Sequence, residues 1–530
     1  MKQYIVKDFL RICLCALVLA SSLLAQGSKQ EKNKTDKVAE NAVDLDPPAE
    51  IKYESQPNDG KGIDSIKQEL AEEERKNEKD YYVNPKSYGT TRILVPQAYV
   101  KTLSQTGISS LKNLDWIEAG LDYRTRYEHR ENDLRRPDAG VDRPLLLRTR
   151  GYFGIKEILD PIRFAVEIED AQRVNGKYEV DNRDFNRAEP INAYGELFFK
   201  NGVGINRPLS VRYGIMSFEF LDRRLIGLNE WRNTTNTFQG AKISLGKDQN
   251  NWSVDFLALK PLERLTNELD KPVRNQLFGG VIGHIRHWSK IITIEPFYLG
   301  LKQSKLDQSK FNETKLAFET NNRIGREIHT VGVRFYNVYM SGFDYDISAM
   351  TQFGVNDTDK QQRHEAVAYT FESGYSFQHP WKPRAGFFFG YVSGDKNPND
   401  NTNQRFERLY GFARPWSSND YIQMENLKSP KIVVEFEPLR GVKVDTAVVW
   451  FYLASAKDRW SGVGNLRDQT GQSGEYMGFE YNFRARYDLN SRVKANIGYA
   501  YFKPGDFTIN TTGREMNSHF GYLELMYSLF

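Results

Sequence analysis

The sequence has very little cysteine: Cys13 and Cys15 are its only two, and both lie near the start of the chain. Three basic residues precede an apolar stretch at 12–20, and small residues follow it, which is the order typical of a secretory signal peptide. We therefore expect residues 1–25 to be a signal peptide, the alternative being an N-terminal core helix. The exported protein would then contain no cysteine, which excludes disulfides, thiolate nucleophiles and cysteine-bound metals.

Long hydrophobic runs and an excess of one charge are also missing. No apolar run reaches the roughly 18 residues that a transmembrane helix needs, so a helical membrane protein is excluded. The 73 basic and 69 acidic side chains nearly balance, so the composition gives no reason to expect nucleic acid as a partner.

The sequence motifs of common enzyme classes are absent as well. The seven histidines show no H-E-x-x-H spacing, and the chain has neither a G-x-S-x-G nucleophile elbow nor a phosphate-binding glycine loop. The closest metal-like pair, His284 and His287, would point to opposite faces of a strand. We expect no enzyme activity, no cofactor and no metal site, and a hydrolase site assembled across strands is the alternative.

Aromatic residues, in contrast, are abundant for so polar a chain: 29 Tyr, 32 Phe and 8 Trp make up 13% of it, and its mean hydropathy is −0.62. This content is far above that of a segment unable to bury a core, so most of the chain should fold. Residues 26–112 differ, because they are rich in Lys, Glu, Asp and Asn. They indicate a polar periplasmic linker or extension, either a solvated tether or a small docking element.

From residue 113 to the end, apolar and polar residues alternate in short segments separated by Gly, Asn, Asp and Pro, which predicts β-strands. Dividing these 418 residues by roughly 23 per strand and connection, which leaves 9 to 11 for the membrane, gives about 18 strands. The expected strands include residues 116–130, 145–156, 162–169, 209–217, 329–336, 345–354, 384–392, 431–437, 479–489 and 493–501.

Alternation alone also fits a soluble β-sandwich. Two features favour a barrel in a membrane: the polar faces carry Arg, Glu and Asp interleaved with Gly, and the apolar faces carry aromatic residues near the strand ends. We therefore predict an all-β protein whose residues 113–530 form a transmembrane antiparallel up-and-down β-barrel in the lipid of a bacterial outer membrane. The chain also ends in Phe530, as such barrels commonly do, although this residue is out of step with the preceding alternation.

Several stretches of this region resemble the alginate-export porin family. They include VRYGIMSFEF at 211–220, LDRRLIGLNEWRN at 221–233, FDYDISAMTQFG at 343–354 and the segment 477–505 that ends in YAYFKPG. The resemblance implies an anion-selective barrel that passes an acidic polysaccharide or oligosaccharide across the outer membrane, often beside a periplasmic scaffold protein built from helical repeats.

Basic residues on the predicted polar faces support an anionic cargo, because a guanidinium group binds a carboxylate through two hydrogen bonds and stays charged. The alternative is that they pair with wall carboxylates as a structural ladder. The loop at 231–233 is expected either to fold inward as a constriction or to cap the outside. The residues expected to line the pore are Arg124, Arg126, Arg148, Arg150, Arg163, Arg212, Arg224, Arg232, Arg334, Arg384, Arg484, Arg486 and Lys494.

The sequence therefore predicts an outer-membrane porin that passes anionic saccharide, such as an alginate-like polyuronate, through an arginine-lined lumen. One alternative is a general porin for anions or small solutes. Another is a barrel that acts as an anchor or adhesin without transport. A plugged lumen would favour the anchor, and an open lumen the porin.

Overall fold

The computed structural model describes residues 98–530 except 137, 290–291, 306–323 and 338–341. The chain divides into two units, residues 1–77 and 78–530, and all described residues belong to the second. The predicted signal peptide, 1–25, and the part of the predicted extension before residue 98 lie outside the described residues. No helix within the described ranges is long and apolar enough to span a membrane.

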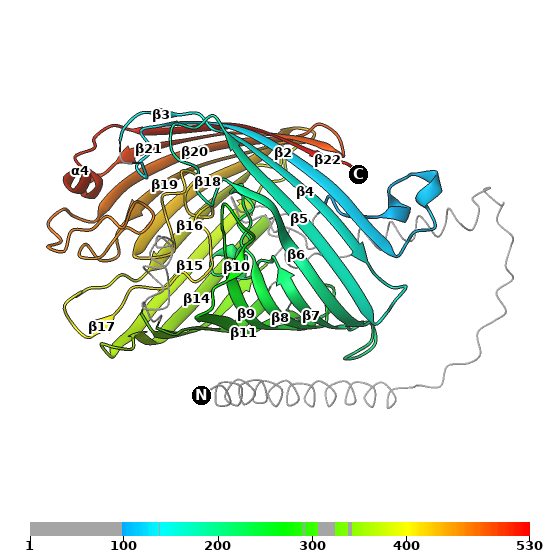
Figure 1. Ribbon diagram of the computed structural model, residues 1–530. Helices are drawn as coiled ribbons and strands as arrows, with labels where there is room; N and C mark the ends of the chain where they lie inside the picture. Colours follow the sequence, from blue (N-terminus) through cyan, green and yellow to red (C-terminus); the bar gives the residue numbers. More distant parts are fainter. Residues whose placement is uncertain (1–97, 137, 290–291, 306–323, 338–341) are drawn as a thin grey trace, which may run out of the picture. The chain divides into compact units, whose positions relative to one another are not determined.

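In the part of the chain that the structure describes, eighteen long antiparallel strands form one closed barrel (Figure 1). The ring closes because the first long strand, β2 (Ile117–Glu131), pairs with the last, β22 (Ser518–Ser528). The predicted all-β barrel of about 18 strands is therefore confirmed. The wall between these two is built, in order, by β4 (Leu145–Ile155), β5 (Ile162–Val174), β6 (Asn186–Phe199), β7 (Leu209–Met216), β8 (Phe238–Leu245), β9 (Trp252–Glu263), β11 (Gln276–Ser289), β12 (Ile292–Gln303), β13 (Arg326–Tyr336), β14 (Gly342–Asp357), β15 (Gln362–Ser376), β16 (Arg384–Val392), β18 (Leu427–Leu439), β19 (Val442–Tyr452), β20 (Tyr476–Asp488) and β21 (Val493–Pro504).

Several short elements precede or connect the long strands of the wall. A short helix follows β21 and stops at Gly513, whose positive φ of 67° provides the left-handed C-terminal cap that glycine adopts without strain. The short elements are β1 (Lys101–Thr102), β3 (Val141–Asp142), β10 (Lys271–Pro272), β17 (Thr402–Asn403), the 3-10 turns η1 (Leu103–Gln105), η2 (Ser109–Leu111) and η3 (Leu221–Arg223), and helix α4 (Asp506–Thr512).

The wall strands follow the predicted period of two, because successive side chains of a strand point to opposite faces of the sheet. In β2, Leu121, Tyr123 and Tyr127 are exposed on the outer face, whereas Arg124 and Arg126 between them are buried on the inner face. An apolar, aromatic outer face and a charged inner face are typical of a barrel whose wall lies in lipid.

The two ends of the barrel differ in the length of their connections. At one end the connections are short: residues 246–251 join β8 to β9, and residues 489–492 join β20 to β21. The other end carries long loops, among them 217–237, 393–426 and 453–475. We refer to the two ends as the short-turn end and the long-loop end. In outer-membrane barrels the short turns face the periplasm.

Two of the long loops fold into the barrel and form much of its core. We call residues 217–237 the first inner loop and residues 393–426 the second inner loop. Their apolar side chains, such as Phe218 and Ile226 from the first and Trp416 and Tyr421 from the second, belong to one buried cluster with side chains of the wall. The interior of the barrel is therefore narrowed by the chain itself.

The two inner loops are joined to each other by backbone hydrogen bonds. The amide of Gly227 donates to the carbonyl of Tyr410 (3.1 Å), and the amide of Tyr410 donates to the carbonyl of Leu225 (2.9 Å). The contact requires a glycine, because a Cβ atom on Gly411 would lie 1.7 Å from the carbonyl oxygen of Arg224. The loops thus form one unit across the barrel.

Candidate functional site

Four of the predicted arginines form a patch on the inner face of β2 and β4. The strands pair so that Arg124 lies opposite Arg148 and Asp122 lies opposite Arg150. The side chains of all four arginines, including Arg126, are at most 2% exposed. The strand register therefore brings together the cations that the sequence placed on two separate segments.

The first inner loop lies directly over this patch and is held there by the arginines. Arg124 donates to the carbonyl oxygens of Glu230 and Arg232, each at 2.8 Å, and Arg126 donates to that of Trp231 at 2.7 Å. The 231–233 loop, for which the sequence left two alternatives open, is placed inside the barrel.

The carboxylate of Glu230 lies between Arg148 and Arg150 and compensates charge on both. It forms an ion pair with each of them, and the one with Arg150 spans 2.6 Å. Burial raises the pKa of Glu230, but the charges of Arg148, Arg150 and Arg124 outweigh burial and lower this pKa to about 2. Glu230 is therefore ionised at every physiological pH.

The remaining charges of the patch are balanced by wall carboxylates. Arg126 pairs with Glu128 at 2.9 Å, Arg150 pairs with Glu169 at 2.8 Å, and Glu524 lies within 4 Å of both Arg124 and Arg126. Buried charges are tolerated when they are paired and hydrogen-bonded.

Trp231 links the first inner loop to the second. Its ring lies between two guanidinium groups, with Cζ of Arg126 at 3.9 Å and Cζ of Arg414 at 3.6 Å from the ring centroid. Such cation–π contacts are attractive, and more so away from water. Its edge also packs on Tyr522 of β22, 4.8 Å away between centroids.

The second inner loop has an anchor of its own, Glu480 on β20. This carboxylate is fully buried and accepts hydrogen bonds from the Ser417 hydroxyl (2.8 Å), the Ser418 amide (2.6 Å) and the side-chain amide of Asn419 (2.8 Å). Both inner loops are thus fixed to the wall by charged groups on opposite sides of the β2–β22 seam.

A small cavity of about 70 Å³ lies beside Trp231 toward the long-loop end, and we call it the outer vestibule. Burial lowers the pKa of Arg232, and nearby Arg183, Arg264 and Arg408 lower it further against the effect of Asp420, to about 10. Repulsion from three neighbouring arginines indicates a locally positive site. The charged residues that line the outer vestibule are Arg126, Arg130, Arg135, Arg136, Arg183 and Arg232, with Glu128, Asp142, Asp181, Asp184 and Asp420.

The other predicted pore residues are distributed around the barrel, and most of them lie beside carboxylates. Lys494 is exposed near the short-turn end of β21 and lies opposite Asp488 in the strand register, but within the described residues it forms no ion pair of 4 Å or less. This pairing is the pattern that the ladder alternative describes, so a pore-lining role for these residues stays a prediction. The pairs are Arg163 with Asp160, Arg212 with Glu196, Arg224 with Asp222, Arg232 with Asp420, Arg334 with Glu295 and Asp346, Arg384 with Asp344 and Glu435, and both Arg484 and Arg486 with Asp445.

Sequence reasoning named Arg224, Arg232 and the loop at 231–233, but it missed other residues that the inner loops contribute. Glu230 and Asp420 pair with arginines, and Arg414 stacks on Trp231, yet no strand periodicity marks positions in loops. Glu480 on the wall accepts a hydrogen bond from the Ser418 amide in the second inner loop, a contact that strand periodicity does not indicate. The available signal was the unusual length of these two loops and their content of Trp and Arg.

Comparison with known proteins adds to this geometry. A sequence model of the family described as "Alginate export" matches residues 115–522. Among solved structures, OccAB1 of Acinetobacter baumannii superimposes with a TM-score of 0.51 at 12% identity, covering 78% of this chain and 97% of that one. OpdQ of Pseudomonas aeruginosa superimposes with a TM-score of 0.49 at 13% identity, covering 78% of this chain and 97% of that one. These likenesses concern the fold alone, and no curated protein matches the chain.

Proposed function

The chain belongs to the alginate export family, a family of outer-membrane transport barrels, and from this premise we propose that its cargo is an anionic saccharide such as an alginate-like polyuronate. The observation that carries the proposal is the outer vestibule, where six arginines and five carboxylates surround one small cavity. Arginine suits such a cargo because its planar fork matches a carboxylate.

The positive surplus of the vestibule supports anion selectivity. Arg183 is exposed, and its ion pair with Asp181 spans 3.6 Å, a distance at which an exposed pair contributes little. The Arg232–Asp420 pair is also long, at 3.5 Å. A passing uronate can therefore exchange with these carboxylates, and contacts of this strength let it leave again.

The proposal separates the arginines into two groups. Arg124, Arg126, Arg148 and Arg150 are buried and hold the first inner loop, so they act on the cargo by positioning that loop. Arg183 and Arg232 at the vestibule are the residues proposed to meet the carboxylates of the cargo. The periplasmic scaffold partner that the family resemblance implies would bind at the short-turn end.

Selectivity can be tested by reversing one vestibule charge. We expect Arg183→Glu to move the reversal potential in planar bilayers from anion toward cation preference and to slow the passage of uronate oligomers about tenfold, because one cation is replaced by an anion. Neutral oligomers should pass at the parental rate.

Arg440→Glu is the matched control, since Arg440 is exposed in the short turn between β18 and β19 and its replacement changes the net charge equally. A parent channel that prefers cations, or a shift of the same size in the control, would contradict the proposal. A channel that passes chloride but excludes uronate oligomers would instead point to a general porin for small anions.

A further inference from the structure

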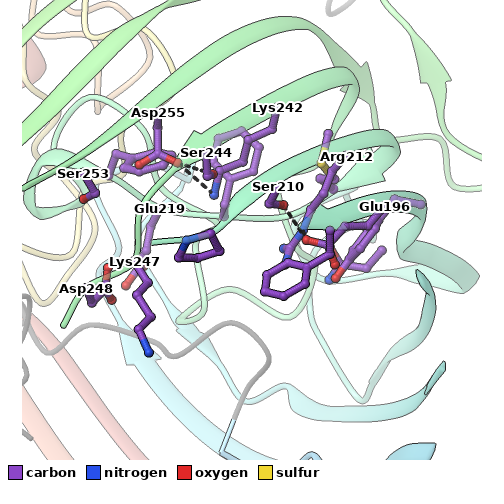
Figure 2. Close-up of a pocket in the computed structure, with 18 of the residues that line it drawn as sticks. Glu196, Ser210, Arg212, Glu219, Lys242, Ser244, Lys247, Asp248, Ser253 and Asp255 are labelled. Atoms are coloured by element: carbon purple, nitrogen blue, oxygen red, sulfur yellow. Dashed lines mark hydrogen bonds and ion pairs between the residues drawn. The ribbon is translucent and has the colours of Figure 1, made fainter. Parts of the chain in front are cut away.

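A second, larger cavity of about 270 Å³ lies inside the barrel toward the short-turn end. Residues of β6 to β9, including Met216 at the end of β7, line it, together with the turn residues 246–249 and residues 217–220 at the start of the first inner loop. Figure 2 shows ten of the lining residues by label, among them Glu219, Lys247 and Asp248. This volume is slightly below the roughly 300–1,000 Å³ of pockets for drug-sized ligands, so the cavity suits a smaller group, of the size of one sugar ring. We call it the inner cavity.

Hydrogen-bonding groups of both kinds surround the inner cavity. Figure 2 shows Ser210 and Glu196 beside Arg212, and Ser244 beside Asp255 and Lys242. The Ser244 hydroxyl donates to Asp255 at 2.5 Å, and its oxygen can still accept a bond from a ligand.

Arg212 has donors left for a ligand. Within the described residues it donates through Nε to Glu196 at 2.9 Å, and its side chain is 24% exposed. Arg212 is one of the residues that line the cavity. Its guanidinium group lies over the ring of Tyr194, 4.8 Å from the centroid, which fixes its plane.

Apolar rings line the same cavity. Phe218 and Phe220 line it from the first inner loop and are buried, and Tyr194 and Phe198 contribute from β6. A sugar ring combines an apolar face of C–H groups with hydroxyls at its edge, so a pocket with aromatic walls and charged hydrogen-bonding groups matches its surface.

The inner cavity and the outer vestibule differ in the balance of charges that line them. Three cations border it, namely Arg212, Lys242 and Lys247, together with four carboxylates. An anionic ligand group would meet those carboxylates with little net attraction, whereas a hydroxyl both donates and accepts and can use either kind of group. The lining thus favours hydroxyls over carboxylates.

We propose that the inner cavity is a saccharide-binding subsite at the short-turn end that holds one sugar ring through its hydroxyl groups. The inference rests on the proposed function only in taking the cargo to be a saccharide. It assigns a different role to each site: the inner cavity recognises the hydroxylated ring of the saccharide, and the outer vestibule recognises its charge.

The test uses the full-length protein in detergent and isothermal titration calorimetry with neutral trimers of mannose, glucose and galactose. We expect at least one trimer to bind the parent, and Ser244→Trp, which fills the cavity with an indole ring, to weaken that binding at least about tenfold. Ser491→Trp is the matched control, because Ser491 is exposed in the short turn between β20 and β21. It should bind like the parent.

A second variant tests the same site in case Ser244→Trp does not fold. The pair Ser210→Ala with Ser244→Ala removes two hydroxyls without adding volume, and it should weaken binding about fivefold. Heat-modifiability on gels checks that each variant is folded. Absence of binding by all three trimers, or equal affinity of the parent and the folded Ser244 variants, would overturn the subsite.

The same titration separates this inference from the proposed function. A mannuronate trimer should bind more weakly to Arg183→Glu than to the parent, whereas the neutral trimer should bind both equally. If uronate and neutral trimers respond alike to Arg183→Glu, the charge selectivity fails and the inner cavity stands. If only the neutral trimer fails to bind, the inner cavity falls and the selectivity stands.

Discussion

At the residue scale, the position of the first inner loop depends most on Glu230. Its carboxylate faces Arg148 and Arg150, and its carbonyl accepts from Arg124 and Arg148. Both guanidinium groups that meet the carboxylate are at most 1% exposed. Removing one partner of a buried ion pair leaves an uncompensated charge, which costs more than the pair itself contributes.

We expect Glu230→Gln to weaken the attachment of the first inner loop by about 2–4 kcal/mol. The loop contains Arg223 and Arg224 as trypsin sites, and cleavage there should be at least about tenfold faster, because the loop must leave the wall to be cut. Peptide mass spectrometry measures the rate. The control Glu475→Gln removes an exposed pair with Lys428 and should change nothing.

The attachment should also depend on pH with a defined sign. The pKa of Glu230 is lowered to about 2 in the folded barrel, from an ordinary value of 4.5. Its stabilisation is therefore complete above about pH 4.5 and is lost as the pH falls through about 2. The first inner loop narrows the interior of the barrel, so weakening its attachment should change the conductance of the channel. The difference in conductance between the parent and Glu230→Gln should be constant from pH 7 to 5 and should shrink toward pH 2, as Glu230 becomes protonated. A constant difference over the whole range would contradict this assignment.

At the element scale, the end of the predicted extension joins the barrel. Strand β1 pairs with β2 at Ala119 and Glu118, beyond the point where pairing with β22 stops. Tyr99, just before β1, is 5% exposed, packs on Tyr152 and donates its hydroxyl to Glu167. Gly120 makes room, because a Cβ there would lie 2.7 Å from the carbonyl of Tyr99. Residues 99–102 therefore contact the wall, although the sequence placed them in the extension.

Truncating Tyr99 should release this segment. Loss of a buried aromatic side chain costs about 3–5 kcal/mol, and here the loss falls on the docking of β1 rather than on the barrel. The only cysteines of the sequence precede residue 16, so Lys101→Cys gives a single label site after signal cleavage. Maleimide labelling should be at least about tenfold faster with Tyr99→Ala than with Tyr99→Phe, which keeps the packing. Equal rates would show that Tyr99 does not hold the segment.

At the scale of the whole molecule, closure of the barrel distributes stability around the ring. Within the described residues, each wall strand has two hydrogen-bonded neighbours, including β2 and β22, so the described wall has no open edge. Apolar side chains such as Phe153, Phe164 and Tyr213 face outward and need lipid to cover them.

The intact protein should therefore fractionate with the outer membrane, give a β-rich circular dichroism spectrum in detergent and change its mobility on gels after heating. Deleting residues 27–97 while keeping the signal peptide should preserve all three properties, because the described wall begins later. A helical spectrum, cytoplasmic fractionation or failure of the shortened protein to insert would contradict this view of the molecule.

The sequence by itself determined the kind of wall and about half of its strands individually; β6, β9, β12 and β15 are among those not identified one by one. A period of two fixes which side chains face lipid and which face inward, because strand geometry makes that choice locally, and positions such as Tyr123 and Arg124 could be assigned without coordinates. The segment at 384–392 was placed to the residue as β16. The family resemblance, carried by motifs spread over the same region, is confirmed as well.

Only the tertiary structure showed which parts of the chain lie inside the barrel. Loops have no periodicity, so nothing in the sequence placed Glu230 between Arg148 and Arg150, or Arg414 on Trp231. These contacts join residues far apart in the chain, and they form because buried arginines must find carboxylates and carbonyls wherever the closed barrel brings them. The sequence thus specified the barrel and the charges of its wall, and the folding of two loops into the barrel decided which of these charges bind other parts of the chain.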